Sequence, residues 1–253
     1  MVMLDPPYFP SAAFDKNRRQ SIFDWQLVAK ECERVLAKSG VVVLWGNQPR
    51  LMDHFQKYFT EAFRVQGEVI WVKTAPNLII SQHRPMPQHE DAWILVRHKD
   101  PLTLNLARTA KQSVNGKLTL GSSKKTTRGG PRQPETGSYA KTRSKYENLA
   151  SQQGGKIHYG IGHYLSTVIT TRPIHGGHPE YLGHPTQKAL DVVKPLISLA
   201  TKPGNRILDP FAGSGTTLVA AEMMGGDSLG IELNAAFCKL TRERLDAWNG
   251  KPL

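Results

Sequence analysis

Four apolar segments in the first hundred residues predict β-strands. Residues 41–45 read Val-Val-Val-Leu-Trp between two glycines, and such a continuous run is typical of a central parallel strand covered on both faces. The run at residues 1–4 predicts another short buried strand. Residues 65–72 and 92–96 predict two further strands, which we expect to pair as an antiparallel edge of the sheet.

Helical spacing of apolar residues appears between these strands. A capping signal at Ser21 and Asp24 begins a predicted helix that ends at Gly40. The apolar face of this helix consists of Trp25, Val28, Cys32, Val35 and Leu36. A second helix is expected over residues 50–59, so the first part of the chain has the order β-α-β-α-β-β.

The alternation of helices and strands resumes at residue 184. Residues 184–188 are expected to open a helix, with Thr186 as its cap and Pro195 as the site of a kink. The pattern then predicts a strand, a glycine-rich turn, a helix, another strand and a last helix, at residues 206–209, 210–217, 218 onward, 228–232 and 235–248.

The tetrapeptide Asp5-Pro6-Pro7-Tyr8 is expected in a loop at the carboxyl end of the first strand. Its two prolines fix two φ angles at about −65° and remove two backbone donors, so the loop is a rigid surface of acceptors. Asp5 adds a carboxylate, and Tyr8 adds a ring that can stack on another flat ring. This chemistry matches the exocyclic amino group of a flat base such as adenine or cytosine.

Positive charge is concentrated in the middle of the chain. Residues 97–172 contain fourteen Lys and Arg against three acidic residues, so eleven of the twelve net positive charges lie there. Residues 121–156 are too poor in apolar side chains for a core and predict an insertion, which is either a solvated loop or a segment that orders on a phosphate backbone. Phosphate contacts are expected mainly from Lys124, Lys125, Arg128, Arg132, Lys141, Arg143 and Lys145.

Length and composition exclude several other classes of protein. With 253 residues, 39% of them apolar, the chain suits one large domain or one domain with an insertion. It has no apolar run of the ~20 residues that span a bilayer and no signal-peptide pattern, so we expect a cytoplasmic protein. Cys32 and Cys238 are expected as reduced, buried thiols. His83, His89 and Glu90 fit no metal-ligand spacing, so no metal site is predicted.

The glycine-rich turn predicts a nucleotide pocket, because glycine allows close approach of a ligand and the helix start presents free amides. A Walker loop needs Lys after its last glycine, and Thr216 follows Gly215 instead. A dinucleotide fingerprint needs a small residue where Leu218 stands. Glu232, at the end of the next expected strand, suits the two ribose hydroxyls of an adenosine. These exclusions favour S-adenosylmethionine.

Two motifs together resemble those of the DNA amino methyltransferases. The segment Asp209-Pro210-Phe211-Ala212-Gly213-Ser214-Gly215-Thr216-Thr217 resembles the cofactor motif, and Asp5-Pro6-Pro7-Tyr8 resembles the catalytic motif. The order of catalytic motif, basic insertion and cofactor motif is similar to that of the β class. Residues 184–188 resemble the segment before the cofactor motif, and residues 71–74 with His89-Glu90 match patterns that flank the recognition region. The resemblance covers most of residues 1–97 and 182–253.

The resemblance implies an α/β fold, the circularly permuted, Rossmann-like three-layer sandwich of S-adenosylmethionine-dependent methyltransferases. It implies a catalytic half at residues 1–99, a basic target-recognition insertion at 100–181 and a cofactor-binding half at 182–253. The strands that end at Asp5 and Asp209 are then neighbours, and cofactor and target meet outside their carboxyl ends.

The resemblance also implies roles for the catalytic residues Asp5, Pro6, Pro7 and Tyr8. Asp5 and the Pro6 carbonyl accept hydrogen bonds from the target amino group and direct its lone pair toward the methyl sulfonium. Tyr8 stacks on a base that has been flipped out of the duplex, and direct in-line transfer needs no covalent enzyme intermediate. The implied cofactor residues are Asp209, Phe211, Ala212, Gly213, Ser214, Gly215, Thr216 and Glu232, with Thr186 and Lys188 at the methionine end.

Several points stay open at the level of sequence. Family members usually carry a further strand and an acidic turn before the catalytic motif, whereas four residues precede Asp5 here. Either a wall of the adenosine pocket is missing because the start is abbreviated or misassigned, or its contacts come from elsewhere. An Asp at the head of the catalytic motif favours N6 of adenine in double-stranded DNA, with N4 of cytosine as the alternative. A catalytically silent DNA-binding homologue and an RNA methyltransferase are the other hypotheses. A homodimer and a cognate restriction nuclease remain open as partners, and no membrane contact is expected.

Overall fold

The computed structural model describes residues 1–7, 24–74, 88–101, 104 and 167–248. These residues belong to one compact unit, formed by Met1–Asn105 and Ser166–Leu253. Tyr8 and the seven Lys and Arg expected to contact phosphates lie outside the described residues. No helix among the described residues is long and apolar enough to cross a membrane.

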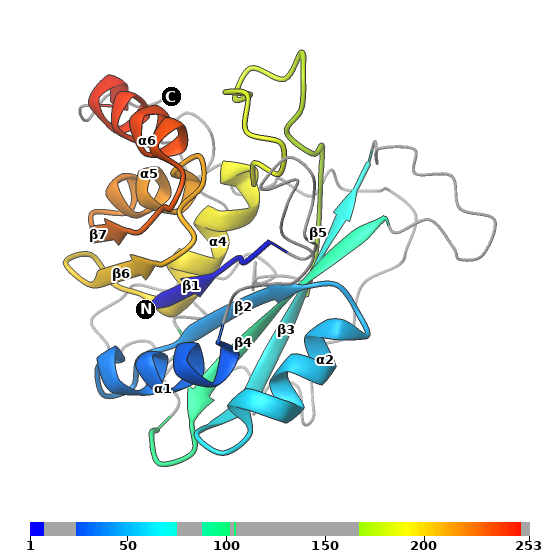
Figure 1. Ribbon diagram of the computed structural model, residues 1–253, viewed down its shortest axis with the longest axis vertical. Coiled ribbons are helices and arrows are strands. Elements are labelled where there is room, and N and C mark those ends of the chain that lie inside the picture. Colours follow the sequence, from blue (N-terminus) through cyan, green and yellow to red (C-terminus); the bar gives the residue numbers. More distant parts are fainter. Residues whose placement is uncertain (8–23, 75–87, 102–103, 105–166, 249–253) are drawn as a thin grey trace, which may run out of the picture. The chain divides into compact units, whose positions relative to one another are not determined.

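The described residues form a mixed sheet (Figure 1). Its strands are β1 (Val2–Leu4), β2 (Val42–Gly46), β3 (Phe63–Lys73), β4 (His89–Arg97), β5 (Val168–Thr171), β6 (Arg206–Asp209) and β7 (Asp227–Gly230). They lie in the order β5-β3-β4-β2-β1-β6-β7. β4 is antiparallel to both β2 and β3, and the other pairs are parallel. The prediction that β1 and β6 are neighbours is confirmed, since Val2 pairs with Leu208.

Helices cover both faces of this sheet, as a three-layer sandwich requires. They are α1 (Trp25–Val35), α2 (Arg50–His54) with its π-helical continuation η1 (Phe55–Phe59), α4 (Leu190–Ala200), α5 (Thr216–Met223) and α6 (Ala235–Trp248). Figure 1 shows α1 and α2 on one side of the sheet and α4 and α5 on the other. Asp24 is itself the N-cap of α1, three residues later than the capping signal at Ser21 and Asp24 predicts, and its carboxylate accepts a hydrogen bond from the Leu27 amide at 3.0 Å.

The core lies on both faces of the central strands. Val2 and Leu4 pack against Trp25 of α1 and Phe59 of η1. The alternation of side chains along a strand sends Met3 to the opposite face, where the indole Nε1 of Trp45 donates to its sulfur at 3.2 Å. Each large side chain buried in this way contributes about 1.5–3 kcal/mol. Burial on both faces explains why these strands read as continuous apolar runs.

Several predicted element boundaries are wrong. The first helix, expected to run to Gly40, ends at Val35, because the backbone of Leu36 is already extended. α4 begins at Leu190 with Ala189 at its N-cap and no side-chain cap, so Thr186 does not cap it. The reason is that residues 184–188 form a turn, in which the Thr186 amide donates to Nδ1 of His184 at 3.3 Å. The last predicted strand, expected over residues 228–232, is β7 and ends at Gly230, so Glu232 lies in the following loop.

Strand β5 was not predicted. It lies within the range 100–181 assigned to the insertion, yet it pairs in parallel with β3 through residues 70–73. The indole of Trp71 donates to the Thr171 hydroxyl at 2.8 Å and fastens the two strands together. The division into three segments at residues 99 and 181 stays a prediction.

Candidate active site

Asp5 lies directly after β1, at the carboxyl end of a central parallel strand. The neighbouring strand β6 ends at Asp209, so the expected catalytic motif and the glycine-rich turn occupy the same edge of the sheet. In open α/β sheets this edge is where ligands bind. The proline after Asp5, Pro6, is buried, whereas Pro7 is half-buried.

Three charged side chains form a chain of ion pairs with Asp5. The ammonium group of Lys188 lies 2.8 Å from Oδ1 of Asp5 and 2.9 Å from Oε2 of Glu90. The other carboxylate oxygen of Glu90 accepts a hydrogen bond from Lys73. Asp5, Lys188, Glu90 and Lys73, which we call the charge cluster, come from the loop after β1, the turn before α4, strand β4 and strand β3. The cluster contains two cations and two anions and is balanced in charge.

Burial and pairing compete in setting the ionisation of this cluster. Burial raises the pKa of Glu90, but the ammonium groups of Lys188 and Lys73 outweigh it and hold this pKa at about 2. Burial lowers the pKa of Lys188, but the carboxylates of Asp5 and Glu90 reverse this effect and raise it above its usual range. Lys188 and Glu90 are therefore a charged pair at neutral pH.

The two lysines of the charge cluster each lie over the ring of a tryptophan. The Lys188 ammonium lies 5.0 Å from the ring centre of Trp45, and the Lys73 ammonium lies 4.9 Å from that of Trp71. The two rings meet edge to face at 6.4 Å. The negative face of an indole attracts a cation, so these contacts offset part of the cost of burying the lysines.

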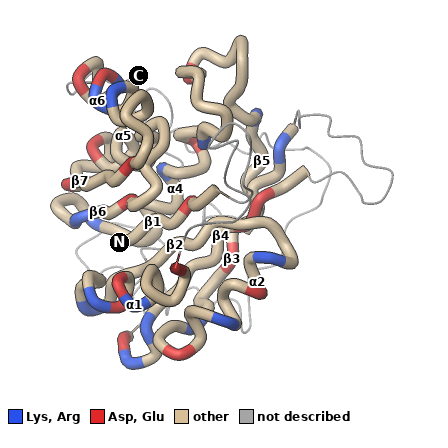
Figure 2. Tube along the Cα trace, viewed as in Figure 1, with Lys and Arg blue, Asp and Glu red and all other residues tan. Residues whose placement is uncertain are grey.

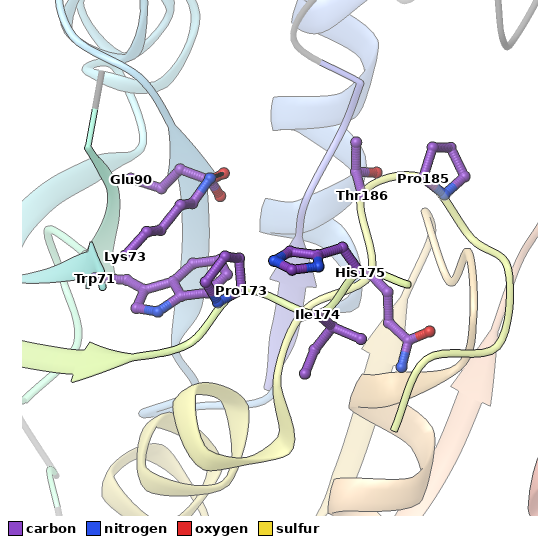
Figure 3. A pocket seen from close by; sticks show the side chains of 9 residues that line it. Trp71, Lys73, Glu90, Pro173, Ile174, His175, Pro185 and Thr186 are labelled. Atoms are coloured by element: carbon purple, nitrogen blue, oxygen red, sulfur yellow. Dashed lines mark hydrogen bonds and ion pairs between the residues drawn. The ribbon is translucent and has the colours of Figure 1, made fainter. Parts of the chain in front are cut away.

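A shallow pocket opens beside the charge cluster, with a volume of about 120 Å³. Figure 3 shows Trp71, Lys73 and Glu90 on one side of it and Thr186 on the other. Its remaining lining residues are Pro173, Ile174, His175, Pro185 and Gln187. The pocket therefore combines an aromatic wall with charged and hydroxyl groups.

The glycine-rich turn between β6 and α5 is held by its own backbone and by Asp209. The carboxylate of Asp209 accepts from the Phe211 amide at 2.9 Å, and the Ala212 amide donates to the Ile231 carbonyl at 2.9 Å. Gly213 and Gly215 have positive φ angles of 52° and 75°. These angles lie in the left-handed region, where a side chain is strained, so both positions favour glycine.

The space beside these two glycines is filled by the protein itself. A Cβ atom at Gly215 would lie 2.6 Å from the Thr241 side chain, and one at Gly213 would lie 3.0 Å from Nε2 of His184. The Thr241 hydroxyl also donates to the Gly213 carbonyl at 3.0 Å. The glycines thus bring α6 and the turn before α4 close to the loop.

Glu232 faces the glycine-rich turn from the loop after β7. Its two carboxylate oxygens accept from the Gly213 amide at 2.9 Å and from the Asn234 amide at 2.8 Å. The side chain is half-buried, and each carboxylate oxygen has a further lone pair. These two acceptor oxygens fit the ribose hydroxyls of an adenosine cofactor, which would donate to them.

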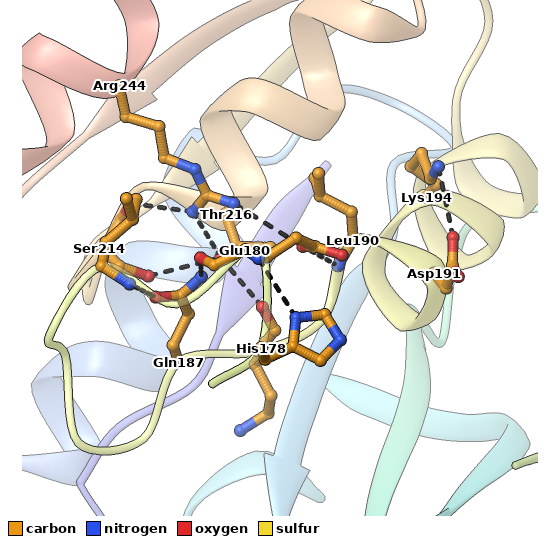
Figure 4. A network of polar contacts seen from close by, with 11 residues as sticks. His178, Glu180, Gln187, Leu190, Asp191, Lys194, Ser214, Thr216 and Arg244 are labelled. Atoms are coloured by element: carbon orange, nitrogen blue, oxygen red, sulfur yellow. Dashed lines mark hydrogen bonds and ion pairs between the residues drawn. The ribbon is translucent and has the colours of Figure 1, made fainter. Parts of the chain in front are cut away.

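A polar network links the glycine-rich turn to the charge cluster, and Figure 4 shows the part of it around Arg244, Ser214 and Thr216. The Arg244 guanidinium donates to the Ser214 carbonyl at 3.0 Å and to the Thr216 hydroxyl at 2.8 Å. The Thr216 hydroxyl in turn donates to the carbonyl of Lys188 at 3.1 Å. The same guanidinium lies 3.9 Å from the Glu180 carboxylate. The turn is therefore connected, through the Thr216 hydroxyl, to the residue that binds Asp5.

The structure brings together most of the residues expected at the site. Asp5, Lys188 and the loop at residues 209–216 lie at one edge of the sheet, and the functional roles assigned to them remain predictions. The side chain of Lys188 bonds Asp5 and Glu90, and its place at the methionine end of a cofactor also stays a prediction.

Sequence reasoning missed Glu90, Lys73 and Arg244 as members of the site. Glu90 was weighed as a metal ligand, rejected, and otherwise placed only in a pattern that flanks the recognition region. The described residues contain no group of three or more His, Cys, Asp or Glu arranged to bind a metal. The patterns at residues 71–74 and at His89-Glu90 were the signal that could have indicated the first two residues.

Two remaining predictions concern the charge balance of the helices and the state of the two cysteines. Figure 2 shows Lys or Arg positions interspersed with Asp or Glu positions along α1, α2 and α6, in agreement with the nearly neutral balance outside residues 97–172. Cys32 and Cys238 are free, as predicted. Cys32 is buried and Cys238 is half-buried, so the expectation of burial holds fully for Cys32 alone.

The sheet order and the site together define a Rossmann-like methyltransferase fold. The parallel strands β2, β1, β6 and β7 carry the glycine-rich turn and Glu232 at their carboxyl ends, and the antiparallel strand β4 lies between β2 and β3. The chain belongs to the DNA methylase family, the N6 and N4 amino methyltransferases, whose sequence model matches residues 1–243.

Individual relatives span most of the chain. DNA adenine methyltransferase YhdJ of Escherichia coli K12 is 26% identical over 251 residues, which are 97% of this chain and 76% of YhdJ. The crystal structure of the M1.HpyAVI complex with SAM has a TM-score of 0.54 and 21% identity, over 96% of this chain and 87% of that one. PvuII DNA methyltransferase, cytosine-N4-specific, has a TM-score of 0.58 and 13% identity, over 96% of this chain and 78% of that one. The two structures establish the fold.

Proposed function

We propose that this protein transfers a methyl group from S-adenosylmethionine to the exocyclic N6 of adenine in double-stranded DNA. Membership of the DNA methylase family supports the reaction class, and the similarity to a DNA adenine methyltransferase supports the choice of base. The observation that carries the proposal is the position of Asp5. Its carboxylate lies at the carboxyl end of β1, next to the glycine-rich turn and held by Lys188.

Asp5 and Pro6 supply the chemistry that the target amino group requires. An exocyclic amine conjugated with its ring is a poor nucleophile, because its lone pair is delocalised. Acceptors at the Asp5 carboxylate and the Pro6 carbonyl would hold both amino hydrogens and orient the lone pair, so alignment and electrostatics supply the rate. The target base must leave the duplex to reach this edge of the sheet.

The residues around the glycine-rich turn suit the cofactor. S-adenosylmethionine supplies a methyl group activated by its positively charged sulfur. Glu232 would accept hydrogen bonds from the ribose hydroxyls, and Phe211 would line the cleft beside it. Thr216 and Arg244 hold the turn in place from behind.

Cytosine N4 is the second candidate for the target atom. The similarity in fold to a cytosine-N4-specific methyltransferase favours it, and the acceptors at Asp5 and Pro6 serve either amino group equally well. The chemical mechanism is the same for both bases, so the proposal of amino methylation does not depend on the choice.

Transfer of labelled methyl groups to unmethylated duplex DNA, followed by nucleoside analysis, tests the proposal. Wild type should form N6-methyladenine, and Asp5→Ala should be slower by a factor of about 100 or more, as when an oriented polar group is lost from a transition state. Asp53→Ala, at an exposed acid in the first turn of α2, is the matched control and should keep wild-type rates.

Each other outcome has a definite meaning. N4-methylcytosine as the product would keep the mechanism and change the base. Equal turnover on structured RNA would remove the assignment to DNA. Absence of transfer, with salt-sensitive DNA binding retained, would identify a catalytically silent DNA-binding homologue. Undiminished transfer by Asp5→Ala would refute the role of the loop.

A further inference from the structure

We propose that Glu90 and Lys73 are positioning residues that set the place of Lys188 against the catalytic carboxylate of Asp5. This inference rests on the proposed methyl transfer at Asp5. Neither residue lies in the catalytic motif or in the glycine-rich turn, and each acts through its neighbour in the charge cluster.

The geometry makes Lys188 a shared partner of two carboxylates. Its ammonium group lies 2.8 Å from Asp5 and 2.9 Å from Glu90, so neither acid is clearly the preferred one. Its side chain is 9% exposed, which leaves little solvent to screen the competition. The position of the ammonium group, and with it the orientation of Asp5, therefore depends on how strongly Glu90 attracts it.

Lys73 moderates that attraction. It bonds the other oxygen of Glu90 and neutralises part of its charge. Without Lys73, Glu90 would have Lys188 as its main cation and would draw it away from Asp5. Without Glu90, Lys188 would face the positive charge of Lys73 with no anion between them. Each single substitution thus unbalances the cluster in a different direction.

The two tryptophans that contact the lysines restrict how the charge cluster can rearrange after a substitution. Trp45 and Trp71 are each 2% exposed and lie under the two ammonium groups. The indole N–H groups of the two tryptophans donate to Met3 and Thr171, and these hydrogen bonds restrict rotation of the rings. A charge left without its partner in this setting is costly, whereas removal of a complete pair is tolerated much better.

This difference between single and paired removal provides the test. We would compare wild type, Glu90→Gln, Lys73→Met and the double variant, with kcat and KM measured for DNA and for S-adenosylmethionine. Each single variant should lower kcat about tenfold or more, while KM for DNA stays near the wild-type value. The double variant keeps Lys188 paired with Asp5 and should recover to within about threefold of wild type.

A matched control uses an ion pair remote from the site. Glu31 and Arg34 form an exposed pair on α1 at 2.6 Å. Glu31→Gln, Arg34→Met and their combination should all keep the wild-type kcat, because an exposed pair is screened by solvent. Lys73→Arg, which preserves the charge, should retain more activity than Lys73→Met.

A structural role alone would give other results. If the single variants lose only folded protein, kcat per cofactor-binding site, counted by titration with S-adenosylhomocysteine, would stay at the wild-type value and overturn the proposal. A double variant whose decrease in kcat is the product of the two single decreases, or a rise of KM for DNA with unchanged kcat, would overturn it as well. Absence of transfer by wild type would instead refute the proposed function and remove the basis of this inference.

Discussion

Asp209 should make the stability of the fold depend on pH in a direction opposite to that of most carboxylates. It ends β6, is 3% exposed and binds the Phe211 amide at 2.9 Å. Burial raises its pKa from 3.8 to about 7, and the negative charges of Asp5 and Glu232 add to this effect. Hydrogen bonds from Thr217 and Phe211 oppose the rise without reversing it.

The size of the effect follows from the difference between the folded and unfolded pKa. A rise from 3.8 to about 7 is roughly three pH units, and each unit corresponds to about 1.4 kcal/mol, so the full effect is about 4 kcal/mol. Because the folded pKa is the higher one, the stability contributed by neutral Asp209 is fully present below pH 3.8. It is lost as the pH rises through about 7, above which both states are ionised.

Urea unfolding of wild type and Asp209→Asn at pH values from 4 to 8 measures this effect. Asparagine keeps an oxygen that can accept from the Phe211 amide and does not titrate. The unfolding free energy of the variant minus that of wild type should rise by up to about 4 kcal/mol between pH 4 and 7, and then level off. The pKa values of Glu90 and His184 are also shifted, but their effects on the pH dependence of the unfolding free energy occur in both proteins and cancel in the difference. A difference that is constant with pH, or that falls, would refute the reasoning.

Two further predictions concern the ligands. S-adenosylhomocysteine at 100 times its Kd should stabilise wild type by about 2.7 kcal/mol, and Glu232→Ala at the same ligand concentration should lose most of that thermal shift; an equal shift in both proteins would remove Glu232 from the cofactor site. DNA affinity should fall steeply with salt, and replacing Lys124 and Lys125 by Gln should reduce the slope of log affinity against log salt by about 0.9 for each phosphate that is no longer neutralised; an unchanged slope would exclude these two lysines from phosphate binding.

The amino-acid sequence by itself indicated most of the described elements of the fold and their order along the chain. The apolar runs at residues 1–4, 41–45, 65–72 and 92–96 each correspond to a strand, and the predicted last helix coincides with α6. The antiparallel pairing of β3 with β4 and the parallel pairing of β1 with β6 are both as expected. The strands, the last helix and the pairing of β3 with β4 follow from periodicity and from turn chemistry, which are local properties of the chain. The pairing of β1 with β6 was implied by the resemblance of the two motifs to those of the DNA amino methyltransferases.

Other features were decided by tertiary structure alone. Strand β5 lies within the basic range that was interpreted as an insertion, and it forms by pairing with the edge of β3 that faces away from β4. The turn at residues 184–188 replaces the expected first turn of α4, because its groups bond to His184 and to the charge cluster.

The charge cluster shows why ion pairs between distant residues could not be predicted from the sequence. Lys188 and Asp5 are 183 positions apart in the chain, and Lys73 and Glu90 come from two further strands. An ion pair depends on distance and on the solvent excluded around it, and neither quantity is encoded in the spacing of residues along a sequence. The motifs alone therefore indicated Asp5 as the candidate catalytic carboxylate. Only the folded sheet shows which residues form ion pairs with it and with each other.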